Sequence, residues 1–113
     1  MALSRRLSDH QIRELIRFRE LVRDKFPDAG IKVFGSAAAG LIFSFSDIDV
    51  AVVSEHFAAV PWADRIRSLR DLCKRGSPVA PIGIVKAELA RSGKCYPSVL
   101  RSVRRSRDVD RLR

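Results

Sequence analysis

The spacing of apolar residues predicts an amphipathic helix near the start of the chain. Apolar side chains recur there every three or four residues, at Ile12, Leu15, Phe18, Val22 and Phe26. Positions with this spacing share one side of a helix, so they define a face that packs on a core. Ser8 and Gln11 resemble a capping box, and Pro27 and Gly30 interrupt the pattern. The helix is therefore expected between Ser8 and Pro27.

Three β-prone runs follow this helix. Residues 31–34 form a short apolar run that ends at a Gly-Ser pair. Residues 47–53, DIDVAVV, are apolar on both faces beyond the first turn, which is typical of a central, buried strand. Residues 79–85 predict a third strand, in which Pro81 and Gly83 indicate an edge position or a bulge.

A second long helix is predicted from Pro61, which suits a first helical turn. Its apolar face carries Trp62, Ile66, Leu69 and Cys73. The charged residues of this segment are placed away from that face: Arg65, Arg67, Arg70, Asp71 and Lys74. Residues 86–90 predict a helical turn. A last helix is expected after Pro97, with Leu100 and Val103 inward and Arg101, Arg104, Arg105 and Arg107 outward.

Length and composition predict one domain that spans residues 1–113. A chain of 113 residues, of which 46% are apolar, can bury a core without disulfides. The fold class is α/β (α+β), with a mixed sheet of three or more strands and helices mainly on one face. No run approaches the roughly 20 apolar residues of a membrane span, so we expect a cytoplasmic protein. Cys73 and Cys95 lack zinc-site or disulfide spacing and are expected to be free thiols.

The positive charge is concentrated at the C-terminal end. The whole chain carries a net charge of +9, and residues 91–113 hold eight basic groups against two acidic ones, a net +6. Such a segment can bind nucleic acid, a phosphate-bearing ligand or an acidic protein. It can equally be the solvated face of a helix. Both interpretations stay open on the sequence alone.

The candidate chemistry lies in two short motifs. Gly35 and Ser36 follow the first strand, where a glycine lets the backbone approach a ligand and a serine at a helix start offers donors to phosphate oxygens. Asp47 and Asp49 stand two apart at the start of the next strand. Their carboxylates then lie on one side of the strand, about 7 Å apart at the backbone. Two such oxygen ligands can share Mg²⁺.

Gly-Ser, ten residues and then Asp-x-Asp resembles the signature of the minimal nucleotidyltransferases in the polymerase-beta-like superfamily. The resemblance also covers the helix before the first strand and the helix and strand after the second. It implies transfer of a nucleoside monophosphate, commonly AMP from ATP, to a hydroxyl acceptor. Gly35 and Ser36 would bind the triphosphate, and Asp47 and Asp49 would bind magnesium and serve as the catalytic carboxylates.

The sequence departs from the family pattern at the third carboxylate, which completes the metal site in active members and can act as general base. Either Ala80 or, in a shifted register, Gly83 occupies its place. Glu88 is the nearest carboxylate, and it could substitute only if its turn folds back over the site.

Two further departures concern the segment between the motifs. Ala37 and Ala39 stand where relatives often carry arginines that neutralise the triphosphate. Residues 41–45, LIFSF, are apolar where relatives are polar. This loop either forms a partner surface or folds onto the core.

Two classes of function follow from the resemblance. The first is an enzyme that works with a small helical HEPN-type protein and, as the antitoxin of a toxin–antitoxin pair, adds AMP to a tyrosine of that partner. The second is a degenerate module that binds a nucleotide or a partner without turnover, as the missing carboxylate suggests. A weaker alternative is nucleic-acid binding by the basic tail, with strong salt dependence. The base, the acceptor and the oligomeric state stay open.

Overall fold

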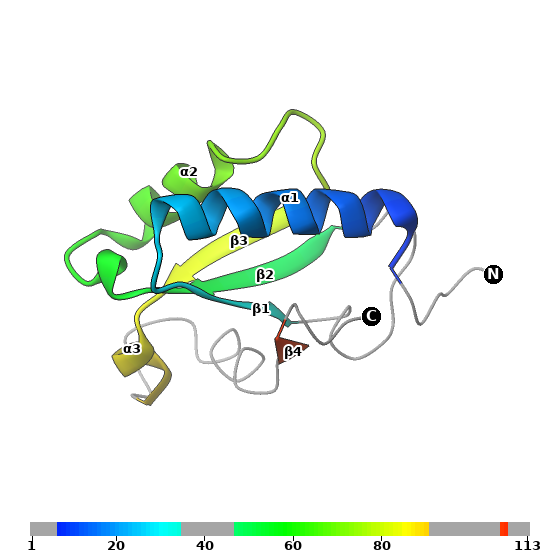
Figure 1. Cartoon of the computed structure of the whole chain (residues 1–113). Coiled ribbons are helices and arrows are strands. Elements are labelled where there is room, and N and C mark those ends of the chain that lie inside the picture. The colour runs from blue at the N-terminus through cyan, green and yellow to red at the C-terminus, as the bar shows by residue number, and fades with distance from the viewer. Residues whose placement is uncertain (1–6, 35–46, 91–106, 109–113) are drawn as a thin grey trace.

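The fold is a mixed β-sheet with two helices packed across one face, as Figure 1 shows. The computed structural model describes residues 7–34, 47–90 and 107–108. In chain order the elements are α1 (Asp9–Lys25), β1 (Gly30–Phe34), β2 (Ile48–Val53), the 3-10 turn η1 (Glu55–Phe57), α2 (Trp62–Arg70), β3 (Val79–Ile84), α3 (Lys86–Ala90) and β4 (Arg107–Asp108).

Four strands of the described residues form one sheet in the order β3-β2-β1-β4. Strand β1 is antiparallel to both of its neighbours, whereas β2 and β3 are parallel. The predicted mixed sheet is thus confirmed, and β2 is the central, buried strand that its apolar sequence indicates. Strand β3 lies at an edge, in agreement with Pro81.

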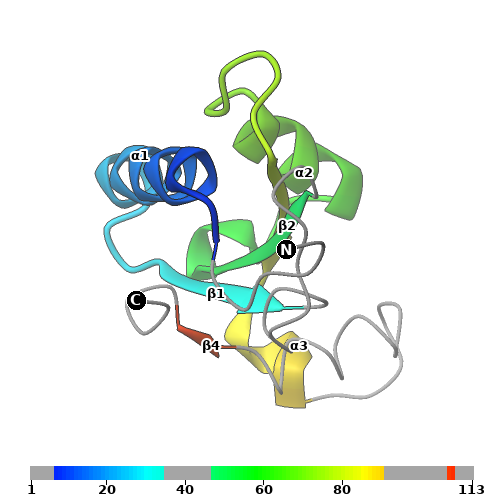
Figure 2. The ribbon, with the colours of Figure 1, turned by 90° about the vertical axis from the view of Figure 1, so that its right-hand side faces the viewer.

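The main core lies between the sheet and the helices α1 and α2, which run side by side over the same face (Figures 1 and 2). It contains residues from every one of these elements: Leu15, Phe18, Val22, Ile31, Val33, Ile48, Val50, Val52, Leu69 and Val79. Alternate strand residues point to the other face, where Phe34, Ala51 and Ile84 form a smaller cluster. Helix α3 lies on this second side of the sheet (Figure 2).

The capping box at the start of α1 is present as predicted. The Ser8 hydroxyl accepts a hydrogen bond from the Gln11 amide at 3.1 Å, and the Gln11 side chain accepts one from the Ser8 amide at 2.8 Å. This arrangement turns Gln11 inward, and its side chain is fully buried while Ile12 is only half-buried. The predicted buried face of α1 is otherwise confirmed, since Leu15, Phe18 and Val22 are buried, and it is extended by Gln11 at its start.

The structure overturns the prediction that Arg65 lies away from the buried face of α2. Arg65 is only 6% exposed. Its Nη1 donates to Oε1 of Glu88 at 2.6 Å and to the Gly83 carbonyl at 3.3 Å, and its Nε donates to the Val60 carbonyl at 2.8 Å. The guanidinium also lies near the rings of Phe57 and Trp62, 6.0 and 5.8 Å from their centroids. Burial is tolerated because the charge is paired and its donors are used.

Gly83 is required by the close approach of α2 to β3. A Cβ atom at this position would lie 2.9 Å from Cβ of Arg65 and 3.1 Å from Cε2 of Phe57. We expect Gly83→Ala to lower the free energy of unfolding by about 1–3 kcal/mol, because the helix must move to admit the methyl group. Urea unfolding measures the change.

Gly30→Ala is the matched control, since a Cβ at Gly30 meets nothing within 4 Å. It should leave the free energy of unfolding unchanged or raise it by about 0.5–1 kcal/mol, as alanine is favoured over glycine in a strand. Equal destabilisation by both substitutions would show that the Arg65 contact is not the cause.

The C-terminal region differs in part from its predicted form. Arg107 and Asp108 form strand β4, which pairs with Lys32 and Val33 of β1, so the predicted helix does not extend to Arg107. The rest of that helix, Cys95 and the apolar loop 41–45 lie outside the described residues. Cys73 is a free thiol, as expected. Among the described helices, none combines the length and the apolar character that crossing a bilayer would need.

Candidate active site

Asp49 is held in the middle of the sheet, on the face that α1 and α2 leave uncovered. It is the second residue of β2, between the fully buried Ile48 and Val50, whose side chains point toward the helices. By alternation, the Asp49 side chain points the other way. Its register neighbours are Phe34 on β1 and Ala80 on β3. Asp47 precedes the strand by one residue and is exposed.

Asp49 is affected electrostatically by its burial and by Asp47. Partial burial raises the pKa of Asp49 above its usual range, and the negative charge of Asp47 raises it further. A nearby like charge can act in this way only when the two carboxyl groups are close. The pair is therefore unfavourable in the absence of a cation, and a bound cation would relieve both effects.

The donor set fits a magnesium ion. Mg²⁺ prefers carboxylate oxygens, keeps several waters and is commonly bound through one or two carboxylates plus the phosphates of a substrate. Asp47 and Asp49 supply two such groups. Within residues 7–34, 47–90 and 107–108 no set of three His, Cys, Asp or Glu side chains could enclose a metal ion. This arrangement suits a cation that is completed by its substrate rather than an all-protein cage.

The predicted phosphate-binding pair, Gly35 and Ser36, lies outside the described residues. The register nevertheless places the end of β1 beside the aspartates, because Phe34 is the ladder partner of Asp49. The Gly-Ser pair follows Phe34 directly in the sequence. The last described residue before the Gly-Ser pair, Phe34, thus lies beside Asp49.

The position of the missing third carboxylate is now decided. Ala80 pairs with Asp49 and, as its register partner, lies on the same face of the sheet. Gly83 pairs with Val52, and a side chain there would point at Arg65 and Phe57 under the helices. A carboxylate at residue 83 could not reach the aspartates, so of the two predicted positions only Ala80 shares the face of Asp49.

Glu88 does not replace that carboxylate. Its Oε1 accepts from Nη1 of Arg65 at 2.6 Å and from the Val85 amide at 2.8 Å. Burial raises the pKa of Glu88, but the hydrogen bonds from Arg65 and Val85 outweigh it and leave the pKa below its usual range. Glu88 follows β3, so it lies beyond the far end of the strands, more than about 13 Å along the sheet from Asp49.

A second polar cluster has the residue types of a hydrolytic triad but not its contacts. The Ser54 hydroxyl donates to Oδ1 of Asp28 at 2.7 Å, and Nδ1 of His56 lies 3.0 Å from the same oxygen. In a catalytic triad the histidine lies between the other two residues, with one ring nitrogen bonded to the serine and the other to the aspartate. Here Ser54 is buried and directly bonded to Asp28, so the cluster links the start of β1 to the end of β2.

Comparison with known proteins decides the family. The family model described as nucleotidyltransferase domain matches residues 15–97, most of the chain. This chain belongs to the nucleotidyltransferase domain family. The matched region contains both motifs, the Ala80 position and the helices and strands that hold them.

A solved structure agrees with this family. The nucleotidyltransferase domain resembles the crystal structure of a Sulfolobus solfataricus protein named as a candidate nucleotidyltransferase, with 28% identity and a TM-score of 0.57. The match covers 74% of this chain and 77% of the other. No curated protein matches the sequence. Domains of this family generally use a nucleoside triphosphate and a divalent metal, so the chemistry predicted from the motifs is of the right general kind.

Proposed function

We propose that this nucleotidyltransferase domain transfers a nucleoside monophosphate, AMP from ATP, to a hydroxyl group of a protein or another acceptor, with Mg²⁺ as the metal. The observation that carries the proposal is Asp49 beside the end of β1, with a pKa that burial raises and the neighbouring Asp47 raises further. A half-buried carboxylate with a second carboxylate beside it has a clear use when it binds a cation, and little use as scaffold.

The reaction is a displacement at phosphorus. The acceptor oxygen forms a bond to the α-phosphorus, the bond to the bridging oxygen of the β-phosphate breaks, and pyrophosphate leaves. Asp47 and Asp49 would hold the metal, and Gly35 and Ser36 would bind the triphosphate. The bound cation would neutralise charge that develops on the phosphate oxygens. The hydroxyl proton passes to solvent or to a base, since Ala80 can accept none.

Ala80 also supports a second candidate function, a module that binds nucleotide without efficient turnover. The residue beside Asp49, Ala80, has only a methyl side chain, and the Glu88 carboxylate forms an ion pair with Arg65. Such a domain would act by docking on its partner. The resemblance to minimal nucleotidyltransferases makes a small helical HEPN-type protein the partner to test, with this chain as the antitoxin that adds AMP to it or only binds it.

The test is calorimetric titration of ATP with and without Mg²⁺, followed by assay of released pyrophosphate. We expect binding that depends on Mg²⁺ in the wild type and is lost in Asp49→Asn, because the amide cannot offer a charged ligand. Asp64→Asn, an exposed carboxylate on α2, is the matched control and should bind normally. Metal-independent binding, or normal binding by Asp49→Asn, would contradict the proposed metal site. Pyrophosphate release in the presence of the HEPN-type partner separates the enzyme from the binding module.

The raised pKa of Asp49 sets the direction of the pH dependence. As the pH falls, Asp49 takes up its proton earlier than an exposed aspartate would, so Mg²⁺-dependent ATP binding should weaken at a higher pH than expected for an ordinary aspartate. In metal-free protein the folded state binds this proton more tightly than the unfolded state does. Its stability should therefore fall as the pH rises through the Asp49 pKa, and Asp49→Asn should remove that fall.

A further inference from the structure

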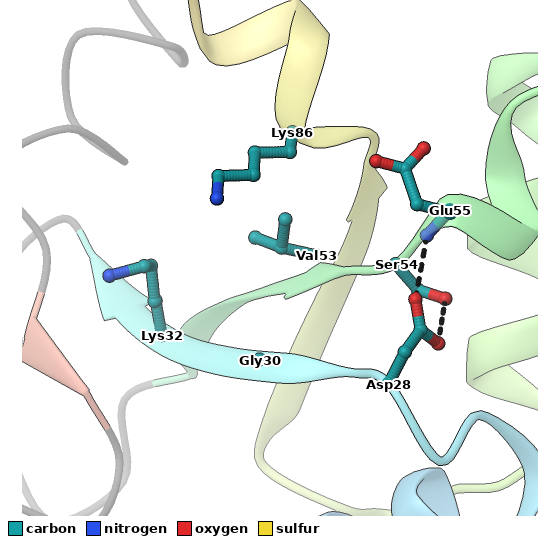
Figure 3. A pocket seen from close by; sticks show the side chains of 7 residues that line it. All are labelled: Asp28, Gly30, Lys32, Val53, Ser54, Glu55 and Lys86. Carbon is teal, nitrogen blue, oxygen red and sulfur yellow. Dashed lines mark hydrogen bonds between the residues drawn. The ribbon is translucent and has the colours of Figure 1, made fainter.

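A pocket of about 330 Å³ lies on the face of the sheet that carries Asp49, at the opposite end of the strands from that residue. Gly30 and Val53, which are ladder partners, lie at its floor (Figure 3). Its walls carry two lysines, two acids and a serine: Lys32, Lys86, Asp28, Glu55 and Ser54. Because Gly30 has no side chain, the floor is open where a larger residue would fill it.

The two lysines give the pocket its chemistry. In Figure 3 both side chains lie over the same side of the strands, and their ammonium groups point away from Asp28. Within the described residues neither ammonium has an ion-pair partner or a hydrogen-bond acceptor. Two cations that line one pocket repel each other, and an anion bound between them would reverse this effect.

The acidic groups of the pocket do not neutralise these lysines. Asp28 accepts hydrogen bonds from the Ser54 hydroxyl and from the Glu55 amide, at 2.7 and 2.9 Å. These bonds, in that order, lower the pKa of Asp28, and His56 lowers it further. Glu55 is exposed on the side opposite Lys32 (Figure 3). The pocket thus has two lysines at one end and two acidic residues at the other, and Asp108 of β4 is the ladder partner of Lys32.

Lys32 and the pocket floor lie on the same face of the sheet as Asp49, a short distance along the strands. Lys32 is the ladder partner of Ala51, two residues from Asp49, and Val53 is four residues from Asp49. These separations are about 7 and 13 Å along the strand, on the same face. A nucleotide bound by the aspartates and the Gly-Ser pair would occupy the other end of β1. The pocket is therefore free for the second substrate.

We propose that Lys32 and Lys86 bind a phosphate group of the acceptor and thereby hold the acceptor on the face that carries Asp47 and Asp49. The inference rests on the proposed function for the role of the acceptor, but the phosphate site itself does not depend on transfer. It gives the acceptor a chemical class: a phosphorylated molecule whose hydroxyl lies on the order of 10 Å from its phosphate.

The site is tested first without metal or nucleotide. Inorganic phosphate is titrated into the full chain in the presence of EDTA, and the backbone amides of Gly30, Val53 and Lys86 are followed by NMR. We expect saturable shifts in the wild type and at least about tenfold weaker binding in Lys32→Gln/Lys86→Gln, since two charge-assisted contacts are lost. Lys25→Gln, an exposed lysine on α1, is the matched control. Absence of shifts, or unchanged shifts in the double variant, would overturn the proposal.

A second measurement identifies the source of the phosphate. The affinity for ATP with Mg²⁺ is compared in the wild type and in Lys32→Gln/Lys86→Gln. An unchanged affinity supports the acceptor, whereas a parallel loss would show that the lysines bind the phosphates of the nucleotide and would overturn the acceptor assignment. The variant Asp47→Asn/Asp49→Asn should show the same NMR shifts as the wild type when inorganic phosphate is added. If transfer is never detected but that response is present, the proposed function fails while the phosphate site stands.

Discussion

Ala80→Asp should increase pyrophosphate release from ATP by about a hundredfold or more, which is the contribution typical of a well-placed general base. Ala80 pairs directly with Asp49 in the parallel ladder, so the new carboxylate would join the aspartates on one face. Ala80 is only half-buried, so the new side chain starts from a position that is partly exposed to solvent. Release is measured with Mg²⁺ and with water or the HEPN-type partner as acceptor.

Ala80→Asn is the control for this gain, because it has almost the same shape but neither binds a proton at neutral pH nor offers a charged metal ligand. It should leave turnover at the wild-type rate. Equal rates for Ala80→Asp and the wild type would mean that the reaction does not lack a base at this position. High wild-type turnover would itself exclude the binding-module alternative.

Glu88→Gln should lower the free energy of unfolding by about 3 kcal/mol, because it leaves the buried Arg65 guanidinium without its counter-charge. The side chains are 7% and 25% exposed, so little water can replace the carboxylate. The pKa of Glu88 is lowered in the folded state, so this stabilisation is present above the pKa of the unfolded chain and is lost as the pH falls through the folded value. Denaturant unfolding across the acidic range measures both effects.

Two comparisons isolate the buried charge. Asp64→Asn removes the partner of Arg67, in a pair whose side chains are 50% and 74% exposed, and should change stability by less than about 0.5 kcal/mol. Arg65→Met/Glu88→Leu removes both charges and should recover much of the loss. A double variant as unstable as Glu88→Gln would show that packing, not the unpaired charge, dominates.

The helices and strands were predictable because they depend on local patterns. Residues 12–26 show the helical period, and residues 48–53 read as a buried strand in sequence as in structure. The two-residue spacing of Asp47 and Asp49 predicts a common side, whereas in the structure only Asp49 lies within β2 and Asp47 precedes it. Where a pattern is local, the sequence is sufficient.

The remaining features depend on pairing between distant segments. The choice between Ala80 and Gly83 required the register of β3 against β2, which no local pattern reveals. Arg65 looked like a surface residue because its partner Glu88 lies 23 positions away. Lys32 and Lys86 belong to elements 54 positions apart and meet only in the folded sheet. A charged residue cannot be assigned to the interior before its counter-charge is known.

Strand β3 is an edge strand, and its hydrogen bonds to β2 show which of its backbone N–H and C=O groups point toward β2 and which point outward. The Ile48 amide donates to the Pro78 carbonyl, and the Ser54 amide donates to the Ile84 carbonyl. The backbone N–H and C=O groups of the even-numbered residues of β3 therefore point toward β2, and those of the odd-numbered residues point to the outer edge. Pro81 therefore faces outward and leaves a gap in the row of donors on that edge. A strand from another molecule could not pair continuously there. The proline thus disfavours edge-to-edge pairing of β3 with a strand of another molecule.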